Sequence, residues 1–216
     1  MGRPLLADPY WGKKALEGRP EDIAPCIRCN EGCLDRGNHL GKSINCTMNP
    51  TLCFEDALAI HPAPEAKKIA VVGGGPAGMQ AAVVAARRGH EVTLFEKRKL
   101  GGLLHEASMP EFKADIRNAL AYLTTQVGKA GVHVVNKTAQ IEDLAGFDGV
   151  ILATGANPVT LPLPGADAPK VQLAVDILNE KAAAVRGNIV VIGGGLIGTE
   201  TAVHLGLQEG NRVTIV

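Results

Sequence analysis

Four cysteines near the start of the chain have types and spacing that could hold a metal cluster. Cys26, Cys29 and Cys33 share one short loop, and Cys46 follows after twelve intervening residues. A [4Fe–4S] cubane takes one thiolate for each iron, and three crowded cysteines with a lone fourth suit it. Zinc is the alternative, although zinc motifs favour paired Cys-x-x-Cys units or histidine partners. The pattern therefore predicts an iron–sulfur cluster held by these four side chains.

The other cysteine and the histidines carry less information. Cys53 stands between Leu52 and Phe54, and these apolar neighbours predict a small buried residue. His39 lies between two of the predicted ligands and is expected to be a loop residue. Five cysteines without an export signal point to a reducing compartment, so we expect a cytoplasmic location.

A glycine-rich motif begins 27 residues after the last predicted ligand, with Gly73, Gly75 and Gly78 in the pattern Gly-x-Gly-x-x-Gly. In a strand–turn–helix these glycines allow a tight turn, close approach of a pyrophosphate and close helix packing. Glu96 follows 18 residues after Gly78, at the end of the next expected strand. An acid at that place accepts hydrogen bonds from a ribose, so the pattern predicts a dinucleotide site.

A second copy of the motif begins 120 residues later, with Gly193, Gly195 and Gly198. The surrounding residues align with the first copy, so the sequence contains an internal repeat. We expect this copy to bind NAD(P)H, with a duplicated fold that has lost its ligand as the alternative. The position that separates NADH from NADPH aligns with residue 217, so the cosubstrate stays open with a weak preference for NADH.

Hydrophobic periodicity predicts the elements that position these motifs. Helices are expected over 77–88, 112–128, 173–185 and 196–207. Strands are expected over 68–72, 92–95, 132–135, 149–152, 188–192 and 212–216. Residues 1–25 show little periodicity, the cysteine segment is expected to be loop-rich, and the prolines of 61–67 predict a linker. Alternating strands and helices predict an α/β fold with doubly wound parallel, Rossmann-like sheets.

The composition excludes some classes of protein. Lys and Arg number 22 and Asp and Glu also 22, so no charge excess suggests binding to nucleic acid. No apolar run approaches the roughly 18 residues of a membrane span. We therefore expect no nucleic-acid partner and no membrane partner. The sequence leaves open whether the chain forms a homo-oligomer.

The order of motifs resembles a known family. Gly2-Arg3-Pro-Leu-Leu-Ala-Asp8 is followed by the cysteine loop, by Cys46-Thr-Met-Asn-Pro50 and by Val71-Val-Gly-Gly-Gly-Pro-Ala-Gly78. This order is similar to that of the multidomain old yellow enzyme relatives, such as 2,4-dienoyl-CoA reductase, trimethylamine dehydrogenase and NADH:flavin oxidoreductases. The resemblance covers essentially the whole chain.

The resemblance implies that the chain is a C-terminal fragment of a larger protein. Residues 1–25 would end an FMN-binding TIM barrel, and 26–60 would carry the [4Fe–4S] cluster. Residues 61–160 would begin a FAD-binding domain and 161–216 an NAD(P)H-binding domain, both incomplete.

The resemblance also implies site residues. Gly2 and Arg3 match the segment that contacts the FMN phosphate, and Gly102 matches part of the FAD site. Leu100-Gly101-Gly102 and Ala153-Thr154-Gly155 resemble segments that lie against the flavin nucleotide in two-dinucleotide flavoproteins. FAD or, as in one branch of the family, ADP could fill the nucleotide site. The remaining residues expected at the two nucleotide sites are Pro76, Ala77, Lys97, Leu196, Ile197 and Glu200.

The activity implied by the resemblance is electron transfer from NAD(P)H through FAD and the cluster to FMN, which reduces activated C=C bonds. The expected substrate of the whole protein is a small alkene, such as an enoyl- or dienoyl-thioester. Amine oxidation of the trimethylamine dehydrogenase kind is one alternative. A stand-alone electron-transfer module that docks on another protein is a second. No catalytic residue is expected within the chain itself.

Overall fold

The computed structural model describes residues 1–179 and 183–216, and its contacts divide the chain into two compact units. The first unit comprises Met1–Leu104 and Asp115–Gly155, and the second comprises His105–Ala114 and Ala156–Val216. Each unit contains one of the two glycine motifs.

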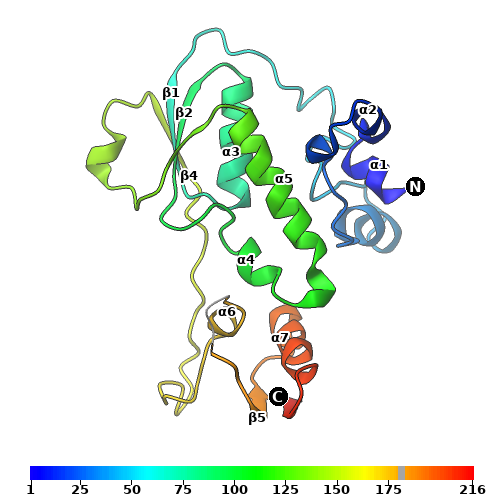
Figure 1. Ribbon diagram of the computed structural model, residues 1–216, viewed down its shortest axis with the longest axis vertical. Coiled ribbons are helices and arrows are strands. Elements are labelled where there is room, and N and C mark those ends of the chain that lie inside the picture. Colours follow the sequence, from blue (N-terminus) through cyan, green and yellow to red (C-terminus); the bar gives the residue numbers. More distant parts are fainter. Residues whose placement is uncertain (180–182) are drawn as a thin grey trace. The chain divides into compact units, whose positions relative to one another are not determined.

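The first unit is built on a four-stranded parallel sheet. Its strands are β1 (Lys68–Val72), β2 (Glu91–Phe95), β3 (His133–Val135) and β4 (Gly149–Leu152), in the order β3-β2-β1-β4. Helices α3 (Pro76–Arg87) and α5 (Asp115–Lys129) connect parallel strands and pack against each other (Figure 1). This is the predicted Rossmann-like arrangement, in which the turn after β1 faces the nucleotide.

The core of this unit lies between the sheet and the two helices. Val71 and Leu94 come from the strands, Met79 from α3, and Leu123 and Val127 from α5, and all are buried. Burial of each such side chain contributes about 1.5–3 kcal/mol. The small residues of α3, among them Ala82 and Ala85, allow the helix to approach the sheet closely.

The second unit repeats the first on a smaller scale. Strands β5 (Gly187–Val191) and β6 (Asn211–Ile215) are parallel, and α7 (Leu196–Gly206) connects them. The main-chain N–H of Gly193 donates to Val216 O at 2.7 Å, as that of Gly73 donates to Phe95 O at 2.9 Å. The two turns therefore share one hydrogen-bonding plan, as expected of a repeat.

Most predicted elements are confirmed to within three residues at either end, but the helix expected over 173–185 is wrong in extent. Helix α6 covers only Ala174–Ile177, and residues 183–185 are not helical. Residues 180–182 lie outside the described part of the chain. Helix α6 packs against α7, and a helix this short is marginal without more extensive packing.

Residues 1–25 are more regular than the sequence indicates. They form α1 (Arg3–Ala7), α2 (Trp11–Leu16) and the 3-10 helix η1 (Pro20–Asp22). Each is too short to show periodicity. A buried carboxylate organises them, because Asp8 accepts hydrogen bonds from Lys14 Nζ at 2.6 Å and from the main-chain N–H of Ala24 at 2.8 Å.

The cysteine segment also departs from the expected loop. Residues Glu31–His39 form a π-helix, η2, which includes Cys33. A π-helix is rare in proteins, and many of those that do occur lie at functional sites. The rest of the segment, and the 61–67 linker, contain no helix or strand. The remaining short helices are α4 (Leu104–Ala107), η3 (Glu111–Lys113) and η4 (Ile141–Leu144). Among the described residues, no helix is both long enough and apolar enough to cross a bilayer.

Charged side chains attach the N-terminal segment to the end of α5. Lys129 Nζ lies 2.7 Å from Asp22 Oδ1 and 2.8 Å from Glu21 Oε1, and Gln126 Nε2 donates to Asp22 Oδ1 at 3.2 Å. Arg19 approaches the other oxygen of Asp22 at 2.8 Å. Hydrogen bonds from Lys129 and then Arg19 hold the pKa of the Asp22 carboxyl well below its usual range.

The substitution Asp22→Asn tests this attachment. A depressed pKa stabilises the fold above the unfolded value of about 3.9 and ceases to do so as the pH falls toward the folded value. We expect the variant to lose about 1 kcal/mol of unfolding free energy at pH 7, with a smaller difference at pH 3. Urea denaturation at both pH values measures this, with Asp56→Asn, an exposed carboxylate, as control. An equal loss at both pH values would contradict the assignment.

Candidate functional site

The turn between β1 and α3 can be built only with glycine at two positions. Gly73 has φ +105°, and a Cβ atom there would lie 2.2 Å from Ala153 O. A Cβ atom on Gly78 would lie 1.8 Å from Gly73 O. These contacts bring the first turn of α3 against the strand, so its free N–H groups face the mouth of the turn. That arrangement suits a phosphate.

Glu96 closes one side of this turn. The residue is 8% exposed, and its two carboxylate oxygens accept hydrogen bonds from the main-chain N–H of Gly74 at 2.7 Å and of Arg98 at 2.8 Å. An ionised carboxylate has about four lone-pair positions, so two remain for a ligand. The carboxylate is thus held beside the turn with capacity to accept from ribose hydroxyls.

Two further predicted segments meet the same turn. A Cβ atom on Gly102 would lie 2.9 Å from Gly75 Cα, and the N–H of Gly101 donates to Gly74 O at 2.8 Å. The N–H of Ala153 donates to Val72 O at 2.8 Å. Three loops therefore converge at the carboxyl ends of β1, β2 and β4. The predicted residues of this unit that lie on these loops or in the first turn of α3 are Gly73, Gly75, Pro76, Ala77, Gly78, Glu96, Lys97, Gly101, Gly102, Ala153, Thr154 and Gly155.

The second turn copies the first. Gly193 has φ +107°, and a Cβ atom on Gly198 would lie 1.9 Å from Gly193 O. Leu196 and Ile197, in the first turn of α7, are largely exposed. The Glu200 carboxylate, in α7, accepts a hydrogen bond from Lys113 Nζ at 2.6 Å.

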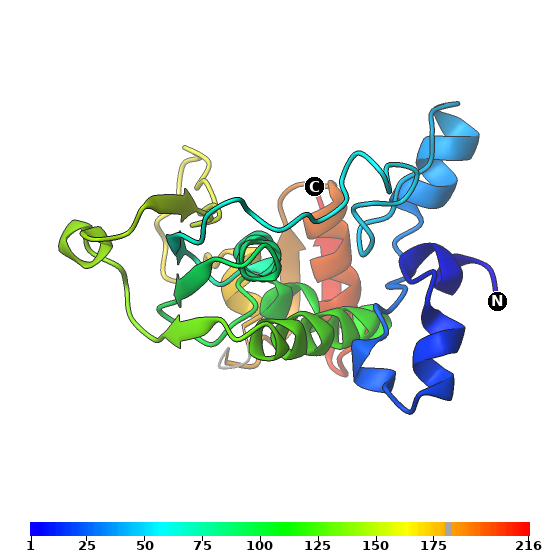
Figure 2. The same cartoon turned by 90° about the horizontal axis from the view of Figure 1, so that it is seen from above.

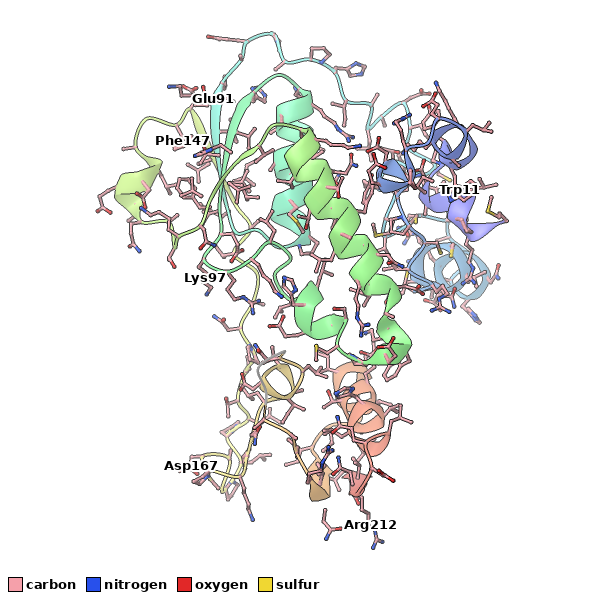
Figure 3. All side chains as sticks on the ribbon, viewed as in Figure 1. Trp11, Glu91, Lys97, Phe147, Asp167 and Arg212 are labelled. Carbon is pink, nitrogen blue, oxygen red and sulfur yellow. The ribbon has the colours of Figure 1, made fainter. Side chains whose placement is uncertain are left out.

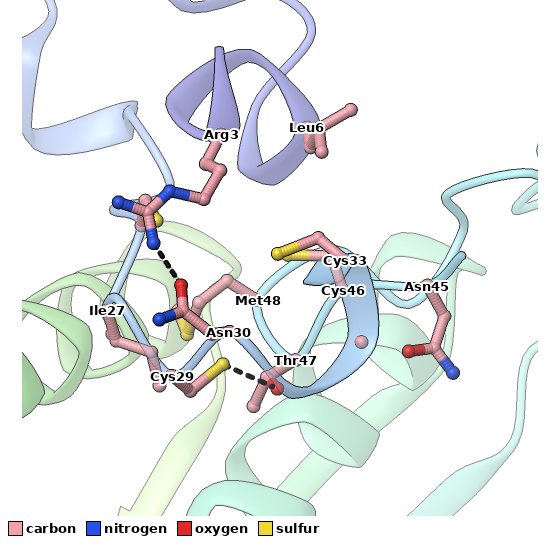
Figure 4. A pocket seen from close by; sticks show the side chains of 12 residues that line it. Arg3, Leu6, Ile27, Cys29, Asn30, Cys33, Asn45, Cys46, Thr47 and Met48 are labelled. Carbon is pink, nitrogen blue, oxygen red and sulfur yellow. Dashed lines mark hydrogen bonds between the residues drawn. The ribbon is translucent and has the colours of Figure 1, made fainter. Parts of the chain in front are cut away.

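The four predicted cluster ligands line one pocket (Figure 4). Cys26, Cys33 and Cys46 are partly buried and Cys29 is exposed, and all are free thiols. The cavity between them is small, about 20 Å³. Within residues 1–179 and 183–216 no three side chains of the His, Cys, Asp or Glu types are gathered to hold a single metal ion. Four thiols around one pocket, without a carboxylate or imidazole among the lining residues, are a donor set that fits an iron–sulfur cluster.

Close packing ties the two cysteine-bearing loops together. The main-chain N–H of Asn45 donates to Gly32 O at 3.0 Å, and a Cβ atom on Gly32 would lie 2.1 Å from Asn45 Oδ1. Cys29 Sγ lies 3.4 Å from Thr47 Oγ1. These contacts hold the segment around Cys46 against the segment that carries Cys29 and Cys33.

Three polar groups around these sites were not anticipated from the sequence. Asn30, at φ +61°, accepts a hydrogen bond from the guanidinium of Arg3, and both residues line the cysteine pocket (Figure 4). Thr47 and the main chain of Gly74 are the others. Only Asn30 carries a sequence signal, since asparagine tolerates the left-handed conformation better than most residues. Gly2 precedes α1 and is exposed.

The prediction that Cys53 is buried is wrong. Its side chain is exposed, and its φ of +66° places it in a turn where the apolar neighbours do not enclose it. His39 ends the π-helix and is exposed, so it lies in a helix and not in the expected loop.

The fold and the two glycine turns define a class of protein with two dinucleotide-binding motifs on Rossmann-like sheets. A model of the family "Pyridine nucleotide-disulphide oxidoreductase" matches residues 67–216, which is more than half of the chain. The chain belongs to this family. The match indicates binding of FAD and NAD(P)H and confirms the predicted fold class.

Known relatives agree with the resemblance read from the motifs. The chain is 46% identical to an NADH oxidase of Thermoanaerobacter brockii over 100% of this chain and 34% of that protein. It is 42% identical to a cinnamate reductase of Clostridium sporogenes over 100% of this chain and 32% of that protein. The chain therefore spans about a third of the length of these curated relatives.

Two solved structures share the architecture. A 2-naphthoyl-CoA reductase aligns with a TM-score of 0.92 and 36% identity, over 99% of this chain and 33% of that one. A histamine dehydrogenase from Rhizobium sp. 4-9 aligns with a TM-score of 0.83 and 26% identity, over 100% of this chain and 34% of that one. The predicted relationship to the multidomain old yellow enzyme relatives is confirmed.

Replacing Gly78 by alanine tests the close contact at the turn. The new methyl group would meet Gly73 O, so we expect a loss of about 3 kcal/mol of unfolding free energy, at the upper end for an overpacked site. Gly128→Ala, in α5 with no atom within 4 Å of the new Cβ, should instead raise it by about 0.5 kcal/mol. Urea denaturation compares the two. A Gly78→Ala protein as stable as the parent would refute the contact.

The variant Glu96→Gln tests the carboxylate beside the turn. It retains the shape and removes the charge, so flavin affinity should fall roughly tenfold, the effect of losing a charged hydrogen bond. Glu91→Gln, exposed at the other end of the same strand, is the control. Fluorescence titration with FAD gives both dissociation constants. Equal affinities would mean that Glu96 only ties down Gly74 and Arg98.

Proposed function

We propose that this chain is the electron-transfer part of an iron–sulfur flavoprotein that passes electrons from NAD(P)H to reduce activated C=C bonds. FAD would occupy the turn of the first unit and the nicotinamide nucleotide that of the second. Cys26, Cys29, Cys33 and Cys46 would hold a [4Fe–4S] cluster. The cluster, when bound, would supply one-electron transfer between FAD and an FMN held mainly outside this chain.

One observation carries the proposal. Four free thiols line a single pocket in the same compact unit as a glycine turn with a fixed carboxylate. A Rossmann turn alone fits many oxidoreductases, whereas four thiols in the same unit favour a one-electron carrier that works together with a two-electron carrier. We propose that the residues of this unit hold and orient the two groups. Gly2 and Arg3, next to the cysteine pocket, are proposed to contact the FMN phosphate.

The relatives favour an alkene as the final acceptor. The names cinnamate reductase and 2-naphthoyl-CoA reductase describe reduction of conjugated acids or thioesters. We propose a small conjugated alkene, such as an enoyl- or dienoyl-thioester, as substrate of the protein that contains this chain, which we place in the cytoplasm. We propose no nucleic-acid or membrane partner.

Amine oxidation is the second candidate, supported by the likeness to histamine dehydrogenase. In that direction electrons would leave the cluster outward, and the first nucleotide site would hold ADP. The reductive direction is favoured because the NADH oxidase and the cinnamate reductase are 46% and 42% identical, against 26% for histamine dehydrogenase.

The test is anaerobic loading of the chain with FAD, iron and sulfide, followed by addition of NADH. We expect close to four irons per chain and, after NADH, the EPR signal of a reduced cluster. Cys29→Ser should lose both. The matched control is Cys53→Ser, because this fifth thiol is exposed and does not line the pocket, and it should behave as the parent does.

Two outcomes would contradict the proposal. Unchanged iron content in Cys29→Ser would remove the ligand assignment. A cluster that dithionite reduces and NADH does not would exclude electron flow from NADH. If NADPH does not reduce it either, amine oxidation becomes the favoured function.

A further inference from the structure

Both ends of helix α5 contact the stretch of chain from Asp22 to Arg28. Its last turn holds Asp22 through Lys129 and Gln126. Its first residue, Asp115, accepts a hydrogen bond through Oδ2 from Nε of Arg28, which lies between the first two predicted cluster ligands. Figures 1 and 2 both show the N-terminal segment beside this helix. The segment that carries Cys26 is therefore attached to α5 on either side of this cysteine.

The distance between the two attachment points on α5 is close to the full reach of the chain that joins them. Helix α5 has fifteen residues and spans about 21 Å. The stretch from Asp22 to Arg28 reaches about 20 Å when extended, and residues 24–30 form neither helix nor strand. A stretch of this length has little slack, so release of Arg28 would free the cysteine loop while Asp22 stayed in place.

The backbone of Arg28 adds a second observation. Its φ is +55°, a left-handed conformation that costs a non-glycine residue free energy and glycine almost none. Its side chain is 65% exposed, so burial of the stem does not explain an arginine at this position. Among the contacts described, the ion pair with Asp115 is the one that an arginine makes at this position and a glycine would lack.

We propose that Arg28 is a positioning residue, whose ion pair with Asp115 fixes the loop of Cys26 and Cys29 against α5 and thereby sets the separation between cluster and flavin. The inference rests on the proposed function, because the separation matters only if electrons cross it. Asp115 is the residue at which the chain returns to the first unit after His105–Ala114. The loop is therefore tied to the start of a helix whose core side chains, Leu123 and Val127, pack with those of the sheet.

Hydrogen exchange of the purified 216-residue chain tests the contact without any cofactor. We expect Arg28→Gly and Asp115→Asn each to raise exchange of residues 24–33 roughly threefold, the effect of losing an exposed ion pair. The double variant should show no more than either single one, and Arg28→Lys should retain part of the protection. Lys137→Ala, which removes an exposed ion pair with Asp143, should leave these residues unchanged.

A merely structural role and a positioning role differ in a second measurement. Arg28→Gly relieves the left-handed strain, so its unfolding midpoint should not fall although its loop exchanges faster. In the loaded chain, Asp115→Asn should slow cluster reduction by NADH roughly threefold, if transfer follows the loosened loop. Asp115→Asn removes a negative charge near the cluster loop, so any shift of the midpoint potential should be upward and favour reduction. A slower reduction therefore reports the loosened loop and not the potential. Stopped-flow absorbance and a redox titration measure the two quantities.

The outcomes separate the two ideas. Unchanged exchange in Asp115→Asn, or additive effects in the double variant, would overturn the inference whatever the cofactors do. Faster exchange with an unchanged rate of cluster reduction would also overturn it, since the contact would then hold the loop for no electron-transfer purpose. A parent chain that loads neither FAD nor iron would refute the proposed function, while the exchange data would still judge the contact.

Discussion

The close approach of a helix to a strand through a single glycine is the constraint on which the rest of this structure depends. Where Gly78 faces Gly73 O, no side chain fits, and the helix can therefore begin directly above the strand. That geometry aims the N-terminus of α3 at the mouth of the turn and leaves a place for the Glu96 carboxylate. The neighbouring loops at Gly102 and Ala153 pack against the same turn. One steric requirement thus shapes the turn on which the neighbouring loops of the first unit converge.

The sequence was sufficient for the parts of the fold that repeat or alternate. Strands of four or five residues with flanking turns, and helices longer than ten residues, have a period that can be read directly, and β1, β2, α3 and α7 were predicted within a residue or so at each end. The expected helix over 173–185 failed because α6 has little to pack against. The short helices of residues 1–25 were missed because one or two turns carry no period.

The cysteine segment also has one part that could be predicted from the sequence and one part that could not. The spacing of the four cysteines was enough to predict that they share a pocket, since three of them occupy one loop. The contacts that tie this segment down were not predictable. Arg3 with Asn30, Arg28 with Asp115 and Asp22 with Lys129 join residues far apart in the sequence, and an exposed charge gives no sign of its partner. Figure 3 draws the side chains of both units and labels Trp11 on α2, Lys97 after β2 and Arg212 on β6.

The duplicated turn has a consequence for how the two halves can diverge. Gly78 and Gly198 are confined to glycine by nearly the same collision with a carbonyl oxygen, at 1.8 and 1.9 Å. A mutation at either position is eliminated for its effect on folding, whatever the nucleotide bound above it. The glycines therefore preserve a visible family likeness without recording a shared ligand. The collision places no demand on the residues around the turn, which differ between the halves, with buried Glu96 in one and the exposed Leu196 and Ile197 in the other. The backbone of the turn can therefore be the same in both halves while the residues around it differ.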